Sequence, residues 1–566
     1  MNGAFARSRA LGGHTVSRPS IAVSLLAGLT LVIGVSVSLA RWPEPVFHDE
    51  FAYLLASDTF AEGRLANPPH PMWRHFETFH VIHQPTYASK YPPGQGLMLA
   101  LGQIALGTPL AGVWFSSVIA VVSCYWMLLG WTSRKWSFVG GLICATHPGL
   151  QLVWGQSYWG GWLAFAGGAL VVGAAVRMIH RHAIRDALLM GTGAVLLALT
   201  RSFEGFVLCL AVGAWIADRW LHSRPILWRE ILGRSVAPLA AVLALLVVGL
   251  GTYNKAVTGH ATTMPYASHE AAYGRCPLFL WQAPQEARTY QHEEIARFHN
   301  EWSMNWYHDQ ESIAGLIKTK SDMGWHSMKL FFPTLLALPL VFVRPWKLGR
   351  LARIVGVLFI VWLATQSTVW NFPHYVAPLA PLLILLMVWG LRHLSILGRR
   401  RLGVRHLVAG LLMLHLLSFV SIANNYVHAS QAGWAVERAR IAAKLATDDD
   451  KHLIFVRYDE DHSVYHEWVY NHADIDGSKV VWAREMGPEQ NAELIDYFVD
   501  RKVWLLEADC ENTQLVPYKN HSALAGELAR RELPARSDSP RRTSSSANET
   551  LPTMNQAARQ RSTNAA

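Results

Sequence analysis

Charged residues are scarce in this chain, and their scarcity excludes an ordinary soluble protein. They make up 16% of the 566 residues, against roughly 25% in globular domains. Apolar residues reach 51%, and the runs 21–40, 111–129 and 239–252 carry almost no charge. Apolar runs near 20 residues are typical of transmembrane helices, so we predict a polytopic α-helical membrane protein with about 12 such helices. Residues 94–131 are interrupted by Gly107, Thr108 and Pro109, and whether they cross the membrane once or twice stays open.

Several motifs are missing as well. The sequence has no phosphate-binding loop, no dinucleotide-binding fingerprint and no internal repeat. Its 5 cysteines form no CxxC pair or zinc pattern, although a disulfide between Cys276 and Cys510 stays open. His80 and His83 lie three residues apart, which gives no clean ligand spacing. We therefore predict no certain cofactor and no metal ligands, with a divalent cation left open.

The formal net charge of +10 does not indicate nucleic-acid binding. The basic residues gather in short blocks between apolar runs, at 177–185, 219–234, 344–353 and 392–405. Such blocks mark cytoplasmic loops under the positive-inside rule. The same rule keeps residues 1–19 in the cytoplasm and predicts no nucleic-acid partner.

The polar segments divide the chain into domains. We predict a transmembrane domain over 20–425, with outer loops at 47–94 and 254–329 on the non-cytoplasmic side. Residues 430–518 follow the last helix and are predicted to form an extracytoplasmic α/β domain. Residues 531–566 lack hydrophobic periodicity, which is typical of a disordered tail.

Within the predicted α/β domain, apolar stretches alternate with helical patterns. Residues 452–458, 479–483 and 502–507 are typical of buried strands, and 463–471 and 488–500 of helices. Strands that alternate with helices favour a parallel sheet.

Acidic and basic residues at the ends of apolar runs are the candidate site residues. Asp49 and Glu50 follow the first run, where a carboxylate can act as a general base or offset a helix dipole. Lys90 and Tyr91 precede Pro92-Pro93-Gly94 at the next run, where they can meet an anionic head group or simply snorkel to the interface.

Two later stretches of the sequence extend this candidate site. Arg201 and Glu204 lie i,i+3 at the start of a helix, so Arg201 can grip a phosphate or the two can form a closed ion pair. His374 can donate a proton to a phosphate or a leaving group, whereas an interfacial aromatic belt explains Tyr375 equally well.

Taken in order, these features resemble a known family. An N-terminal anchor ends in Asp49-Glu50, a large outer loop follows, and Tyr91-Pro92-Pro93-Gly94 opens the next helix. This arrangement resembles the GT-C membrane glycosyltransferases that use polyprenyl-phosphate sugars, in particular the protein O-mannosyltransferases and lipid A aminoarabinose transferases. The likeness is best over 20–220 and looser to 425, and the terminal domain at 430–518 departs from both subfamilies.

The resemblance implies an inverting transfer of a sugar from a polyprenyl-phosphate donor to a hydroxyl, outside a bacterial inner membrane. It implies that Asp49 positions or deprotonates the acceptor, with Glu50 as its companion, and that Lys90 binds the lipid phosphate. Tyr91, Arg201, Glu204, His374 and Tyr375 are nominated from their chemistry as further phosphate-binding residues. The acceptor, whether protein, lipid or glycan, stays open.

Two other functions remain open from the sequence. A multi-pass transporter would place its site near the bilayer midplane on broken helices within repeats. A membrane-anchored binding protein would work through its terminal domain. The polar candidates here gather at one membrane face, which favours the enzyme.

Overall fold

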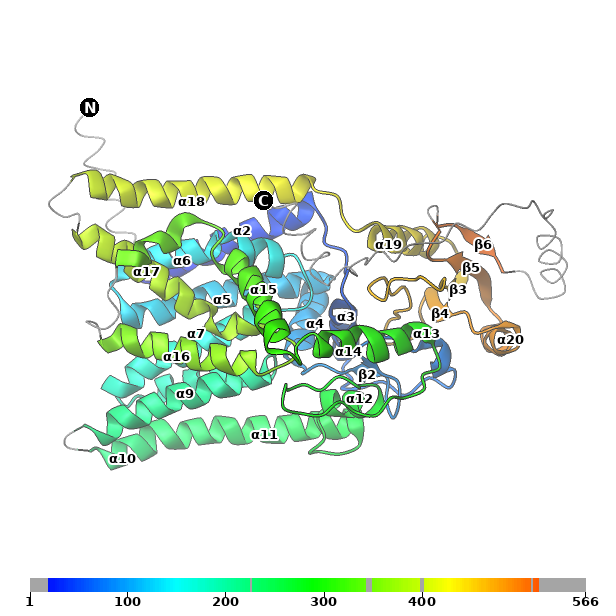
Figure 1. Cartoon of the computed structure of the whole chain (residues 1–566), viewed down its shortest axis with the longest axis horizontal. Helices are drawn as coiled ribbons and strands as arrows, with labels where there is room; N and C mark the ends of the chain where they lie inside the picture. Colours follow the sequence, from blue (N-terminus) through cyan, green and yellow to red (C-terminus); the bar gives the residue numbers. More distant parts are fainter. Residues whose placement is uncertain (1–18, 224–225, 343–348, 398–401, 511–512, 519–566) are drawn as a thin grey trace.

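The computed structural model describes residues 19–223, 226–342, 349–397, 402–510 and 513–518. The cytoplasmic N-terminus predicted before Pro19 and the disordered tail predicted at 531–566 lie outside the described residues. A helical bundle occupies one half of the molecule, and a small sheet with its loops occupies the other (Figure 1).

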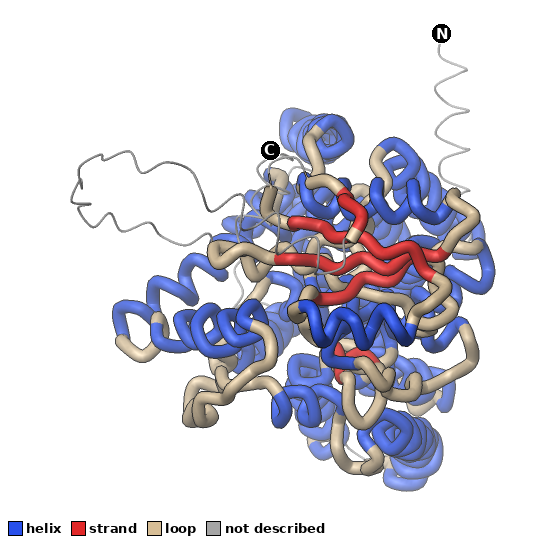
Figure 2. The backbone as a smooth tube through the Cα atoms, turned by 90° about the vertical axis from the view of Figure 1, so that its right-hand side faces the viewer, coloured by secondary structure: helices blue, strands red, loops and turns tan. Residues whose placement is uncertain are grey.

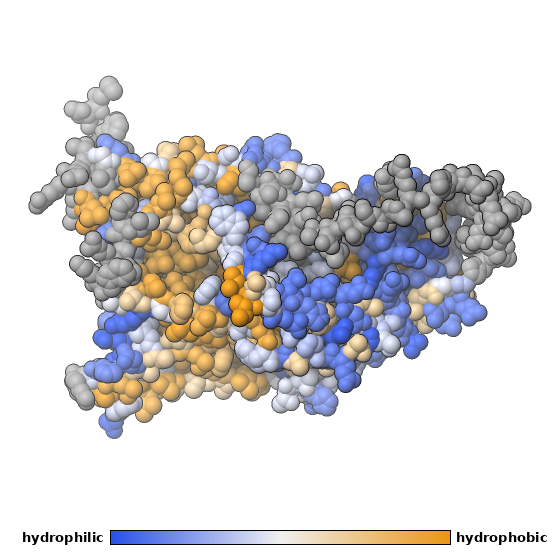
Figure 3. All heavy atoms as spheres, in the orientation of Figure 1, coloured by the Kyte–Doolittle hydropathy of each residue, from blue (hydrophilic) through white to orange (hydrophobic). Residues whose placement is uncertain are grey.

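Six helical stretches of the described residues are long and apolar enough to cross a membrane. Three stretches are single helices, α2 (Pro19–Ala40), α5 (Pro109–Trp131) and α7 (Trp162–His180). The fourth, Trp228–Thr258, is made of α10 (Trp228–Glu230), η3 (Ile231–Val236) and α11 (Ala237–Thr258), and the fifth, Pro373–Leu397, is made of η7 (Pro373–Leu379) and α17 (Ala380–Leu397). The sixth, His406–His428, lies within α18 (Leu402–His428). The apolar half of the molecule forms a hydrophobic surface beside a hydrophilic one (Figure 3).

The predicted number of about 12 spans stays a prediction: beyond these six, several apolar runs of the described residues form shorter or interrupted helices. Pro148 lies between a helix and the π-helical turn that follows it, and Pro339 lies inside a 3-10 helix. Proline removes a backbone donor and crowds the preceding turn, so it interrupts a helix. The remaining helices of the bundle are α4 (Gly94–Leu106), α6 (Arg134–Ala145), η2 (Gly149–Trp154), α8 (Ile184–Ala198), α9 (Ser202–Leu221), η5 (Leu335–Phe342) and α16 (Gly349–Gln366).

Residues 94–131 form a short helix and a long one, α4 and α5, as their central interruption predicts. Gly107 ends α4 with a φ of 73°, a left-handed conformation that suits glycine. The two helices then pack closely, since a Cβ on Gly102 would lie 2.1 Å from the backbone nitrogen of Gly112.

The outer loops form a cap on the bundle. The first loop begins with α3 and contains a two-stranded antiparallel hairpin, and the second contains short helices that end in the longer α15. The cap elements are α3 (His48–Ala61), η1 (Trp73–Phe76), β1 (Val81–Ile82), β2 (Ala88–Ser89), α12 (Pro265–Ala272), α13 (Glu293–Ala296), η4 (Arg297–Trp302), α14 (Ser303–His308) and α15 (Ile313–Phe331).

The C-terminal sheet has four strands in the order β4-β3-β5-β6. Strands β4 and β5 pair with the central β3 in parallel, and β6 pairs with β5 antiparallel (Figure 2). The three predicted strands are thus confirmed, whereas the antiparallel edge strand was not predicted. The elements are α19 (Gly433–Ala446), β3 (Lys451–Arg457), β4 (Val480–Arg484), α20 (Pro488–Tyr497), β5 (Arg501–Glu507) and β6 (Leu515–Pro517).

The helix predicted over 463–471 is wrong. That stretch is irregular, and its end is tied to β4 by the Asn471 side chain, which donates to the Trp482 carbonyl at 2.8 Å and accepts from its N–H at 2.9 Å. A side chain that mimics a strand partner satisfies backbone groups without a helix. The helix predicted over 488–500 is present as α20.

The cap lies between the bundle and the sheet and is packed against both. Phe51 of α3 stacks on Tyr470 with ring centroids 4.2 Å apart, and it shares a core cluster with Phe455 and Val481 of the sheet. Polar contacts join the same surfaces, since Arg484 donates to the Glu77 carbonyl at 2.6 Å. The cap and sheet therefore share one hydrophobic core.

Candidate active site

Helix α3 begins at the adjacent acids, and the structure separates their environments. Glu50 is fully buried. Its Oε2 accepts from the N–H groups of Val46 at 2.8 Å and Phe47 at 3.1 Å, and its Oε1 accepts from the N–H of Tyr158 at 3.0 Å. These bonds occupy both oxygens, so the geometry supports a structural role for Glu50 instead of the catalytic role suggested by the sequence.

Asp49 faces side chains of the cap. Its Oδ1 accepts from the Tyr91 hydroxyl at 2.6 Å and lies 3.4 Å from Nε2 of His80. Burial and the neighbouring Asp49 raise the pKa of Tyr91, so its hydroxyl keeps the proton that it donates. The Asp49 side chain is 19% exposed, which leaves it accessible to a further partner.

The hairpin of the first loop brings His80 beside Lys90. The Lys90 N–H donates to the His80 carbonyl at 3.1 Å, directly next to the pairing of β1 with β2. His80 adopts a φ of 63°, which is uncommon for a residue with a side chain and occurs often at functional sites. Burial, with the nearby charge of Lys90, lowers the pKa of His80 well below its usual range, so its contact with Asp49 is made by a neutral ring.

Lys90 is held by the second loop. Its Nζ lies 3.0 Å from Oε1 of Glu270 on α12 and 4.9 Å from the centre of the Tyr266 ring, and its side chain is only 6% exposed. Burial would raise the pKa of Glu270, but the charge of Lys90 and the contact with His269 lower it below its usual range. The predicted phosphate-binding lysine is therefore paired with a carboxylate from 180 residues away.

Arg201 lies on the membrane side of the same cluster. Its guanidinium lies 4.7 Å from the centre of the Tyr375 ring, and the charges of Glu204 and, more weakly, Asp49 act on it. Within the described ranges, no ion pair includes Arg201. Glu204 is buried in the first turn of α9, but the closed Arg201–Glu204 pair left open by the sequence does not form.

His374 completes the cluster through aromatic contacts. Its ring lies 4.9 Å from Tyr375 and 5.0 Å from Trp159, and Trp159 stacks on Phe47 just before α3 at 4.6 Å. The charge of Arg201 acts on His374. Arg201 and His374 thus both contact Tyr375, and the charge of Asp49 acts on Arg201 and Tyr375.

Sequence reasoning missed several members of this arrangement. Tyr53 stacks on Tyr91 with centroids 4.8 Å apart, and neither Tyr53 nor Glu270 lies in a motif. Trp159 offers a stronger signal, because Gly160 and Gly161 follow it between two apolar runs and adopt φ values of 86° and 124°. Its buried Nε1 has no hydrogen-bond partner among the described residues, so it is a donor available to a ligand.

Metal-ligand geometry is not found in the described part of the chain. No group of three or more His, Cys, Asp or Glu side chains there is placed to hold a metal ion. The arrangement around Asp49 instead joins a partly exposed acid, a buried lysine paired with Glu270, and a half-buried arginine with no carboxylate within ion-pair distance among the described residues. It can accept a proton at Asp49 and stabilise an anion beside it.

Comparisons with known proteins give structural similarity only. No family model matches the chain, and no curated protein matches its sequence. An oligosaccharyltransferase of Archaeoglobus fulgidus, solved with Zn and sulfate, has a TM-score of 0.48 at 10% identity over 86% of this chain and 67% of that one. ArnT from Cupriavidus metallidurans in the apo state has a TM-score of 0.46 at 11% identity over 86% and 92%. The archaeal oligosaccharyltransferase AglB, solved with an inhibitory peptide and a dolichol-phosphate, has a TM-score of 0.41 at 10% identity over 86% and 69%. The structure is thus similar, at low sequence identity, to solved enzymes of the GT-C fold, the group that the sequence motifs resemble.

Proposed function

We propose that this protein is an inverting glycosyltransferase that moves a sugar from a polyprenyl-phosphate donor to a hydroxyl acceptor. The reaction takes place on the extracytoplasmic face of the membrane, where the cap meets the bundle. In this proposal the sheet-bearing region 430–518 also lies outside the cytoplasm, and the donor's isoprenoid chain lies among the membrane helices.

One observation carries the proposal: Asp49 is a partly exposed carboxylate in a cluster that also contains the buried Lys90 and the half-buried Arg201. Lys90 lies over the ring of Tyr91, whose hydroxyl donates to Asp49, and the charge of Asp49 acts on Arg201. Arg201 has no carboxylate within ion-pair distance among the described residues, so we expect its guanidinium to bind an anionic ligand. A lipid-borne phosphate fits this position, because its charge lies at the membrane surface while its chain stays in the bilayer.

The chemistry follows from these positions. The acceptor oxygen attacks the anomeric carbon, the bond from that carbon to the phosphate oxygen breaks, and Asp49 takes the acceptor proton. The electron pair of the broken bond leaves with the phosphate, and Arg201 and Lys90 stabilise the resulting charge. Attack opposite to the leaving group inverts the anomeric centre.

Glu270 fits this reaction as an occupant of the phosphate site. Its Oε1 lies 3.0 Å from Lys90 Nζ, the distance at which a phosphate oxygen would be bound. Without donor, the carboxylate keeps Lys90 ordered. When the donor binds, its phosphate takes the place of that carboxylate.

The direct test is donor turnover by the purified full-length protein in liposomes. A polyprenyl-phosphate sugar labelled in the polyprenyl chain is supplied with a mixture of hydroxyl acceptors, and released polyprenyl phosphate is measured. Wild type releases it, and Asp49→Asn lowers kcat by about 10²- to 10⁴-fold, the usual contribution of a general base. Glu62→Gln, at the exposed end of the same helix, is the matched control and keeps wild-type turnover.

Normal turnover by a folded Asp49→Asn protein would remove the proposed base. Uptake of a small solute by the liposomes, with no release of polyprenyl phosphate, would support the transporter instead.

A further inference from the structure

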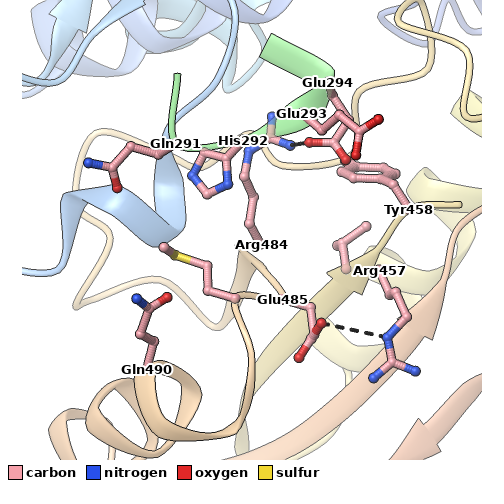
Figure 4. Close-up of a pocket in the computed structure, with 11 residues that line it drawn as sticks. Gln291, His292, Glu293, Glu294, Arg457, Tyr458, Arg484, Glu485 and Gln490 are labelled. Atoms are coloured by element: carbon pink, nitrogen blue, oxygen red, sulfur yellow. Dashed lines mark hydrogen bonds and ion pairs between the residues drawn. The ribbon is translucent and has the colours of Figure 1, made fainter. Parts of the chain in front are cut away.

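A second polar cavity lies at the edge of the C-terminal sheet, apart from Asp49. It has a volume of about 240 Å³ and lies where the parallel strands β3 and β4 end (Figure 4). Tyr458 follows β3, and Glu485 follows β4. The carboxyl ends of parallel strands are the usual ligand-binding edge of an open α/β sheet.

The second outer loop closes this cavity from the other side. Its lining residues there are Gln291, His292, Glu293 and Glu294, just before and within α13. Gln490 of α20 adds an exposed amide on the sheet side. The cavity therefore forms only when the cap and the sheet are packed together.

Apart from the exposed Glu293, the charged groups in the wall are already in ion pairs. Arg484 pairs with Glu294 at 3.0 Å and with the buried Glu467. Arg457 pairs with Glu485 at 3.6 Å (Figure 4). Burial lowers the pKa of His292 to about 3, so its ring is neutral.

This charge pattern selects among ligands. An anion finds no unpaired cation in the described wall, and an apolar ligand would lie against mostly polar side chains. A hydroxyl group, in contrast, donates to a carboxylate and accepts from a guanidinium at once, so it can join both ion pairs without breaking them. The volume is below the roughly 300–1,000 Å³ of pockets for drug-sized molecules and suits one sugar ring.

We infer that this cavity binds one uncharged sugar unit, and that the acceptor of the proposed glycosyltransferase is a glycan. The second half of this inference rests on the proposed function, whereas the sugar site itself does not. Contacts connect the two sites: Arg484 donates to the Glu77 carbonyl, the Glu77 carboxylate accepts from Tyr273 at 2.7 Å, and the Tyr273 ring packs at a tilt on His269, beside Glu270, with centroids 5.0 Å apart. A glycan bound at the sheet edge therefore contacts the loop that holds Lys90.

The experiment measures binding of maltotriose, mannotriose and chitotriose to the full-length protein by saturation-transfer NMR, without donor. Glu293→Ala combined with Gln490→Ala removes two exposed side chains of the cavity whose loss leaves both ion pairs intact. The matched control combines Glu286→Ala and Glu489→Ala, which are exposed on the same two segments but do not line the cavity. Inorganic phosphate and trilysine are the charged probes.

At least one trisaccharide is expected to bind, with affinity weakened about tenfold in the cavity variant and unchanged in the control, as loss of a hydrogen bond to a charged group predicts. Binding of no trisaccharide, equal binding in both variants, or binding of only phosphate or trilysine at the cavity would overturn the inference. Sugar binding without any donor turnover would contradict the proposed transferase and leave the sugar site standing.

Discussion

The two cations beside Asp49 occupy contrasting surroundings. On the cap side, Lys90 is neutralised by Glu270, a carboxylate of the same protein. On the membrane side, Arg201 rests over the ring of Tyr375, and the described residues offer it no ion pair. The cap cation is thus held by a direct ion pair, whereas the membrane-side cation is held by an aromatic ring and by the more distant charges of Glu204 and Asp49.

This difference suggests that the two cations bind the donor phosphate at different stages. An aromatic ring favours a cation by about 0.5–2 kcal/mol, and no carboxylate among the described residues lies within ion-pair distance of the half-buried Arg201. Arg201 can therefore bind the phosphate first, and Lys90 binds it only after exchanging Glu270.

Removing the membrane-side cation is expected to have the largest effect. Arg201→Ala lowers kcat/KM by about 10²- to 10³-fold, which corresponds to roughly 2.7–4 kcal/mol for one lost donor to a developing anion. Arg201→Lys restores only part of the loss, because an ammonium lacks the planar fork of a guanidinium. Steady-state release of polyprenyl phosphate is the measurement, and the exposed Arg229→Ala is the control. Equal activity of Arg201→Ala and wild type would contradict the proposed role of Arg201 in binding the phosphate.

Removing the buried acid next to Asp49 tests stability instead of chemistry. Glu50→Ala leaves the N–H groups of Val46, Phe47 and Tyr158 without their carboxylate. We expect the free energy of unfolding to fall by about 2–3 kcal/mol, the cost of unsatisfied buried donors. Thermal unfolding in detergent measures the change, and Glu62→Gln again provides the control. A Glu50→Ala protein with unchanged stability and lost turnover would restore Glu50 to catalysis.

The cap is expected to be sensitive to acid because it contains buried neutral histidines. Burial lowers the pKa of His83 to about 3, of His299 to about 3 and of His269 to about 4. Below pH 6.5 the unfolded chain binds protons that the folded chain does not, so stability falls as pH falls. Each such histidine lowers the free energy of unfolding by up to about 2 kcal/mol at pH 5, because one unit of pKa difference corresponds to 1.36 kcal/mol.

Melting temperatures at pH 7 and pH 5 test this sensitivity. His299→Gln is expected to narrow the difference between the two temperatures, while the exposed His308→Gln leaves it unchanged. If the melting temperatures of wild type and His299→Gln fall equally between pH 7 and pH 5, groups other than His299 cause the sensitivity to acid.

The smallest predicted effect concerns the carboxylate that occupies the cap-side cation. Glu270→Gln removes a competitor for Lys90, so KM for the donor should fall by about two- to fivefold. This change corresponds to the free energy of a partly exposed ion pair, up to about 1 kcal/mol. Donor titrations at fixed acceptor measure it, with Glu286→Gln as the control. If Glu270 only holds the loop in place, the variant instead loses thermal stability and KM does not fall.

The sequence predicted those features that depend on short stretches of chain. Membrane character follows from apolar runs, and strands β3, β4 and β5 follow from apolar residues between turns. The number of membrane helices depends on the shorter apolar runs, some of which are interrupted by proline although composition alone makes them continuous.

Features that depend on distant residues could not be predicted. Asp49 and Glu50 are neighbours of similar chemistry, but Glu50 binds the Tyr158 backbone, 108 residues away, whereas Asp49 binds the Tyr91 hydroxyl, 42 residues away. Lys90 likewise gains its partner Glu270 from a loop without a motif. The pattern at 463–471 suggested a helix because the role of Asn471 as a strand partner depends on Trp482 across the sheet.

The central claim is that a lipid phosphate binds beside Asp49 between the two cations, and direct binding of a radiolabelled polyprenyl phosphate tests it. Arg201→Gln and Lys90→Gln should each weaken binding by about tenfold or more, the value of a charge-assisted hydrogen bond. Asp49→Asn should bind the phosphate as tightly as wild type or tighter, because it removes a carboxylate that faces the anion, and yet fail to turn over. Wild-type affinity in both cation variants, or loss of phosphate binding in Asp49→Asn, would contradict the account.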